Sequence, residues 1–97
     1  VKQESFNPDF FLKLSGRNEI LVVEIKQDDD DTTKNRAKNR DGKRHFAELN
    51  GRLAANGIDW KYHFYFLSPE DYPDFFQAVR DGQHAVWRSG LTQALEA

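Results

Sequence analysis

The sequence has no cysteine, which excludes disulfide bonds and thiolate metal sites as the source of its stability. It has no apolar run that approaches the roughly 20 residues needed to cross a bilayer, and no signal-peptide pattern opens it. Proline and glycine are scarce, with three and six residues, while 38% of the chain is hydrophobic and 31% is charged. This composition is typical of a globular protein, and a cytoplasmic location is expected.

A chain of 97 residues is long enough for one domain and too short for two independent cores. We therefore expect residues 1–97 to form a single domain. Eight phenylalanines contribute to an aromatic share of 13%, which indicates a core built from rings. The opening stretch VKQESFNPDFF has no initiator methionine and leads almost at once into a predicted strand, so we expect a fragment of a longer protein.

The net charge of −2 is unevenly distributed. Residues 28–31 are an unbroken acidic run, and residues 34–53 hold seven of the fourteen basic residues. These seven are Lys34, Arg36, Lys38, Arg40, Lys43, Arg44 and Arg52. Such a segment is either a surface that contacts phosphate groups or a solvated loop. Residues 27–42 show no apolar periodicity and are predicted to form a mobile loop.

Two apolar runs, at residues 10–14 and 19–26, are separated by Ser-Gly-Arg-Asn, which predicts a β-hairpin. A symmetric turn pairs residues whose numbers sum to 33. Period-2 alternation then places five apolar side chains on one face: Phe10, Leu12, Leu21, Val23 and Ile25. The same register pairs Asp9 with Glu24 and puts Lys26 on the face of Glu24.

The remaining sequence predicts helices alternating with one more strand. A helix is expected from Gly42 to a stop at Asn56-Gly57, with Lys43, Arg44 and His45 in its first turn. The aromatic, alternating segment 59–68 predicts a strand. Further helices are expected after the Ser-Pro-Glu-Asp capping pattern that begins at residue 68 and, more weakly, at residues 91–95.

Two acids and a lysine therefore converge at one end of the predicted hairpin. Carboxylates are hard oxygen ligands that suit Mg²⁺, and Mn²⁺ can take its place. A metal there would neutralise a scissile phosphate and lower the pKa of a bound water. A neighbouring lysine would position or deprotonate that water and stabilise the charged transition state. The alternative is an ordinary ion pair at the edge of a sheet.

These residues carry a resemblance to a known family. Pro8-Asp9, followed after a hairpin by Glu24-Ile25-Lys26, resembles the signature of the PD-(D/E)xK nucleases. The resemblance implies a restriction-endonuclease-like α/β core, with a small mixed sheet flanked by helices. It further implies that Asp9, Glu24 and Lys26 are catalytic, and that the metal is held by the two acids and the main-chain carbonyl of Ile25.

Context distinguishes this pattern from its repeats in the chain. Acid-x-Lys also occurs at Asp41/Lys43 and Asp59/Lys61, and Pro-Asp also occurs at Asp74. Only Glu24 ends an apolar strand that is paired with one beginning in Pro-Asp.

The stretches NPDFFLKL, ILVVEIKQ and KRHFAELNGRL are most similar to the C-terminal endonuclease domain of type III restriction enzymes. That resemblance implies double-stranded DNA as substrate, a modification and specificity subunit as partner, and ATP used only by a motor domain outside this chain. The family core opens with a helix, which we expect to be missing from this fragment because Pro8-Asp9 lies almost at its start. We therefore expect an uncovered sheet edge and a homodimer of the fragment.

A set of polar and basic residues is expected to contact the DNA backbone. These are Gln27, Lys38, Arg40, Lys43, Arg44 and His45. Two alternatives stay open: a nuclease-like module that binds DNA without cutting it, and a protein-interaction module whose charges are only solvated.

Overall fold

The computed structural model describes residues 8–26 and 32–97. Its strands are β1 (Phe10–Lys13), β2 (Glu19–Ile25) and β3 (Lys61–Leu67). They form one sheet in the order β1-β2-β3, with β1 antiparallel and β3 parallel to β2. The predicted small mixed sheet is therefore confirmed.

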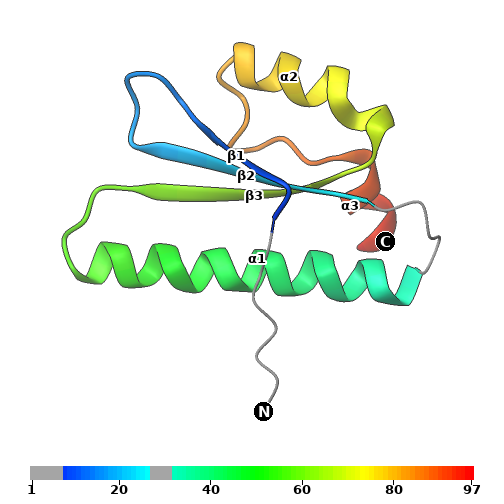
Figure 1. The fold of residues 1–97 in the computed structure, drawn as a ribbon, viewed down its shortest axis with the longest axis horizontal. Helices are drawn as coiled ribbons and strands as arrows, with labels where there is room; N and C mark the ends of the chain where they lie inside the picture. The colour runs from blue at the N-terminus through cyan, green and yellow to red at the C-terminus, as the bar shows by residue number, and fades with distance from the viewer. Residues whose placement is uncertain (1–7, 27–31) are drawn as a thin grey trace.

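Helices cover both faces of this sheet and make a three-layer arrangement (Figure 1). Helix α1 (Thr32–Ala55) lies along one face, and α2 (Tyr72–Arg80), which follows a 3-10 turn at Pro69–Asp71, lies over the other. Helix α3 (Gly90–Leu95) packs beside β3 and α1.

The hairpin has the register expected from the sequence. Phe10 pairs with Val23 and Leu12 with Leu21, and the amide of Leu14 donates to the carbonyl of Glu19 at 3.1 Å. The apolar face of the hairpin contacts the core on the α2 side of the sheet. The buried core residues there are Leu21, Val23, Tyr65, Leu67 and Phe75.

The opposite face packs against α1 through a stack of rings. Phe46 of α1 lies parallel to Phe64 of β3, with centroids 5.9 Å apart, and to Tyr62 at the same separation. The side chain of Asn50 makes two hydrogen bonds to the main chain of Tyr62. Its Nδ2 donates to the Tyr62 carbonyl and its Oδ1 accepts from the Tyr62 amide, both at 2.8 Å. These contacts fix the helix along β3.

The predicted loop at 27–42 is wrong from Thr32 onward, because α1 begins there. Residues 27–31 lie outside the described part of the chain. The first turns of α1 bury Asn35, Asn39 and Gly42 rather than apolar side chains, so a search for hydrophobic periodicity misses them. Lys43 and the two residues after it therefore lie within the helix and not in its first turn.

The end of α1 is where the sequence places it. Gly57 has a φ of +68°, its amide donates to Ala54, and the amide of Ile58 donates to Leu53 at 2.9 Å. These are the two hydrogen bonds of a Schellman motif, which needs a left-handed residue just past the helix.

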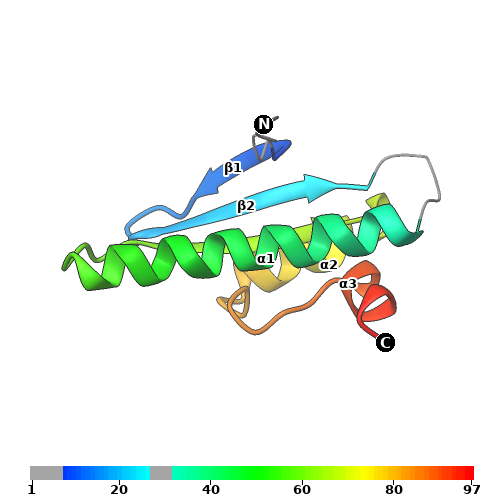
Figure 2. The same ribbon diagram turned by 90° about the horizontal axis from the view of Figure 1, so that it is seen from below.

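Strand β1 is an edge of the sheet among the described residues. In the view from below, α1 lies in front of β3, while β2 and β1 lie to one side of the helix (Figure 2). Phe11, on the α1 face of β1, is accordingly 56% exposed.

Candidate functional site

Asp9, Glu24 and Lys26 lie at the same end of the β1–β2 pair. The amide of Asp9 donates to the carbonyl of Val23 at 3.0 Å, one position out of step with the Phe10–Val23 pair of the ladder. The Oδ2 atom of Asp9 accepts a hydrogen bond from the amide of Ile25 at 2.7 Å. The Asp9 carboxylate is therefore held against the residue that separates Glu24 from Lys26.

Glu24 is half-buried, on the face of the sheet that α1 covers. Burial raises the pKa of its carboxyl group, and the negative charge of Asp9 raises it further, while the charge of Lys38 lowers it. The structure thus brings the two predicted carboxylates within electrostatic range and places Lys38, from α1, near them. The negative charge of Asp9 thus adds to the larger effect of burial on the Glu24 pKa, and a nearby positive charge opposes both.

Most of the other predicted DNA contacts are engaged within the protein. Arg40 and Arg44 lie 3.4 and 3.3 Å from Asp41 Oδ1, and Lys43 Nζ lies 2.7 Å from Glu96 Oε2. His45 is exposed and its ring meets Phe46 edge-on at 4.8 Å. Gln27 lies outside the described residues.

One groove formed by the described residues lies away from the predicted site. This groove of about 370 Å³ runs between α1, β3 and the segment before α3, but Asp9, Glu24 and Lys26 do not line it.

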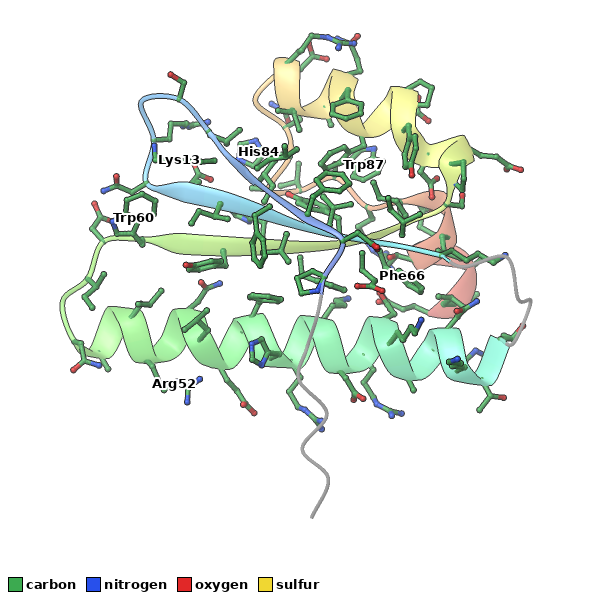
Figure 3. The ribbon with its side chains drawn as sticks, viewed as in Figure 1. Lys13, Arg52, Trp60, Phe66, His84 and Trp87 are labelled. Atoms are coloured by element: carbon green, nitrogen blue, oxygen red, sulfur yellow. The ribbon has the colours of Figure 1, made fainter. Side chains whose placement is uncertain are left out.

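A second polar cluster, formed by Glu19, His63 and His84, lies at the other end of β2. Glu19 Oε1 is 2.8 Å from Nε2 of His63 and 2.9 Å from Nε2 of His84. His84 comes from the segment after α2 and lies on the α2 side of the sheet (Figure 3). It is 2% exposed, although its sequence context gave no indication of a role.

The charge state of Glu19 determines which groups donate and which accept in the hydrogen bonds of this cluster. The hydrogen bond from His84 is the largest influence on Glu19 and lowers the pKa of its carboxyl group. Burial lowers the pKa of His63, against the opposing effect of Glu19. Because an ionised carboxylate only accepts hydrogen bonds, both Nε2 atoms donate to it.

The sequence predicted a strand at residues 59–68, which include His63, and no sequence pattern singled out His63 or His84 as a ligand. His63 and His84 lie 44 and 65 positions after Glu19 in the sequence. A pattern confined to neighbouring residues therefore could not find them.

Comparisons with family models, with curated proteins and with solved structures found no match to this chain. Among the described residues, none of the helices combines the length and the hydrophobicity that a bilayer span requires.

Proposed function

We propose that this chain is a restriction-endonuclease-like nuclease domain that hydrolyses DNA phosphodiester bonds with Mg²⁺. The observation that carries the proposal is the meeting of Asp9 and Glu24 at one sheet end, where the charge of Asp9 helps to raise the pKa of Glu24. A divalent cation would offset the repulsion between two carboxylates held this way.

The donors at this sheet end fit a hard metal ion. Asp9 and Glu24 supply carboxylate oxygens, and Asp9 Oδ2 binds the amide of Ile25. The amide and carbonyl of one strand residue point to the same side of the strand, so the Ile25 carbonyl is expected on the Asp9 side as a third oxygen donor. An all-oxygen set selects Mg²⁺ or Mn²⁺ over softer ions.

Each residue then has a distinct task. Mg²⁺ would supply charge neutralisation at the scissile phosphate and acidify a water. Lys26 would orient the attacking water, take its proton and offset charge on the phosphate in the transition state. Asp9, fixed by the Ile25 amide, would keep the donor set rigid before substrate arrives.

DNA binding would use the α1 residues nearest to this end. Lys38 acts electrostatically on Glu24, so it is the first candidate for a phosphate contact. Arg40, Lys43 and Arg44 would have to exchange their present acidic partners for phosphate. Exposed ion pairs contribute only about 0–1 kcal/mol each, so their loss on DNA binding would cost little free energy.

The wider context is part of the same proposal. The domain would act in a type III restriction enzyme, beside an ATP-driven motor and a modification subunit that reads the recognition sequence. The exposed β1 edge would support a homodimer, which sedimentation measurements on the chain can test.

Metal binding provides the first test. A calorimetric Mn²⁺ titration is expected to show binding that Asp9→Asn removes and Asp74→Asn, at the second Pro-Asp pair, leaves intact. Asp74 lies in the first turn of α2, so it matches the sequence pattern without the geometry. Binding lost only when residues 28–31 are changed to asparagine would refute the site.

Cleavage provides the second test. Nicking of plasmid DNA with Mg²⁺ is measured on this chain. Lys26→Ala should reduce the rate by about 10²-fold or more, while Lys61→Ala, from another acid-x-Lys triplet, should not. Equal rates for Lys26→Ala and the wild type would contradict catalysis at this lysine. DNA binding without cleavage in the wild type would favour the alternative of a binding module.

A further inference from the structure

The cluster of Glu19, His63 and His84 has no part in the proposed nuclease chemistry. Its three potential ligand atoms, one from each residue, all lie within 4.8 Å of one another. Both imidazoles turn the same nitrogen, Nε2, toward a single carboxylate oxygen. Two buried or half-buried histidines converging on one carboxylate is the donor set of many transition-metal sites.

We propose that Glu19, His63 and His84 bind a transition-metal ion, with Zn²⁺ as the expected occupant, at a site separate from the carboxylate pair. Imidazole nitrogens suit Zn²⁺, Fe²⁺, Ni²⁺ and Cu²⁺, whereas Mg²⁺ prefers oxygen. The two ends of β2 therefore have donor sets of different chemical preference.

The two distances from Glu19 to the histidines fit a metal with little rearrangement. Zn–N and Zn–O bonds of about 2.0–2.2 Å in a tetrahedron place neighbouring ligand atoms about 3.3–3.5 Å apart. The Oε1–Nε2 separations are 2.8 and 2.9 Å, so each gap has to open by roughly half an ångström. The metal would take the place of the hydrogen atom on each Nε2, and each neutral imidazole would then carry its proton on Nδ1.

The surrounding structure holds the three ligands in place. Leu21 pairs with His63 across β2 and β3, so Glu19 and His63 project from adjacent strands on one face. Arg17 Nε lies 3.1 Å from Glu19 Oε2, which leaves Oε1 turned to the histidines. The Tyr65 hydroxyl donates to the His84 carbonyl at 2.6 Å and anchors the segment that carries this ligand.

Three protein ligands leave one position of a tetrahedral ion open. The side chains of His63 and Glu19 are 12% and 21% exposed, so a water molecule can reach that position from solvent. The Nδ1 atom of His84 is buried and has no hydrogen-bond partner among the described residues. Histidine ligands usually have such a partner, and its loss typically weakens metal binding about 10–100-fold, so the affinity should be below that of a fully supported site.

The chain offers a matched control, because it has three histidines and the third, His45, is exposed on α1. In the wild-type protein, Zn²⁺ should shift the side-chain ¹⁵N resonances of Nε2 in His63 and His84 and leave those of His45 unchanged. This measurement needs no variant and cannot be confused with misfolding. No shift at His63 and His84, or equal shifts at all three histidines, would overturn the site.

Variants give the second measurement. Calorimetry should find one equivalent of Zn²⁺ on the wild type and on His45→Gln, with binding weakened at least tenfold in His63→Gln and Glu19→Gln. Circular dichroism checks that each variant is folded. Unweakened binding in both folded variants would show that the ion lies elsewhere, and would overturn the proposal.

The two metal proposals can fail separately. Asp9→Asn should keep Zn²⁺ binding and lose Mn²⁺ binding, whereas Glu19→Gln should do the reverse. Loss of Zn²⁺ binding in folded Asp9→Asn would assign the ion to the carboxylate pair and reject the histidine site.

Discussion

Gly42 tests the contact between α1 and the sheet most directly. A Cβ added there would lie 2.6 and 2.7 Å from the two Cε atoms of the Phe64 ring and closer still to its Cζ, well inside van der Waals contact. The ring cannot simply turn away, because it stacks on Phe46 at 5.9 Å. Gly42→Ala must therefore push α1 off the sheet or disturb the ring stack.

The magnitude follows from two opposing effects. Overpacking a core contact costs about 1–3 kcal/mol, while alanine in a helix interior is about 0.5–1 kcal/mol better than glycine. We expect Gly42→Ala to lower the free energy of unfolding by about 1–2 kcal/mol. For a domain of this size that lowers the melting temperature by about 5–15 °C.

Gly51 supplies the matched control in the same helix, because a Cβ there meets nothing within 4 Å. Gly51→Ala should raise the free energy of unfolding by about 0.5–1 kcal/mol. Urea unfolding followed by circular dichroism measures both variants, and equal m-values keep the comparison valid. If Gly42→Ala were as stable as the wild type, the close approach of α1 to Phe64 would be refuted.

Three further substitutions probe the charged and buried polar groups. Burial and the charge of Asp9 raise the Glu24 pKa above 4.5, so the metal-free wild type loses stability as the pH rises through the folded-state pKa. Glu24→Gln should therefore be more stable than the wild type at pH 7. Melting measured as a function of pH should show this difference in stability disappear below pH 4.5. Tyr65→Phe leaves the buried His84 carbonyl without its hydrogen bond and should cost about 1–3 kcal/mol in urea unfolding; an unchanged midpoint would contradict that bond. Hydrogen bonding by Lys43 lowers the Glu96 pKa from 4.5, so its contribution is present above that pH and disappears as pH falls through the folded value. Glu96→Gln should therefore cost at most about 1 kcal/mol at pH 7 and nothing at acid pH, and a constant cost across that range would argue against the ion pair.

The sequence predicted the hairpin because its information is local. Alternation of apolar residues fixed which side chains share a face, and the short turn fixed the register. That register also predicted that Asp9 lies near Glu24, although the amide of Asp9 bonds to Val23, one position out of step. The end of α1 was also predictable, because a left-handed residue such as Gly57 is required within a few positions of the last helical turn.

The first half of α1 could not be predicted from local patterns, because its buried residues are satisfied by distant partners. Asn39 Nδ2 donates to Glu96 Oε2 at 2.7 Å, and its Oδ1 accepts from Thr92 at 3.3 Å. These partners lie 57 and 53 positions away. A buried asparagine is favourable only once α3 has docked, so nothing in the neighbouring sequence distinguishes it from an asparagine in a loop.

The two candidate sites lie at opposite ends of β2, and this separation decides how metal experiments are to be interpreted. Glu19 and Glu24 are five positions apart on one extended strand, so their Cα atoms are separated by about 16–17 Å. Because the number of positions between them is odd, their side chains lie on opposite faces of the sheet. Substitutions farther apart than about 7–10 Å usually have additive effects. A folded double variant with Asp9→Asn and His63→Gln should therefore lose both metals by the amounts that the single variants lose. Strong coupling between the two losses would mean that one metal, or one folding defect, accounts for both.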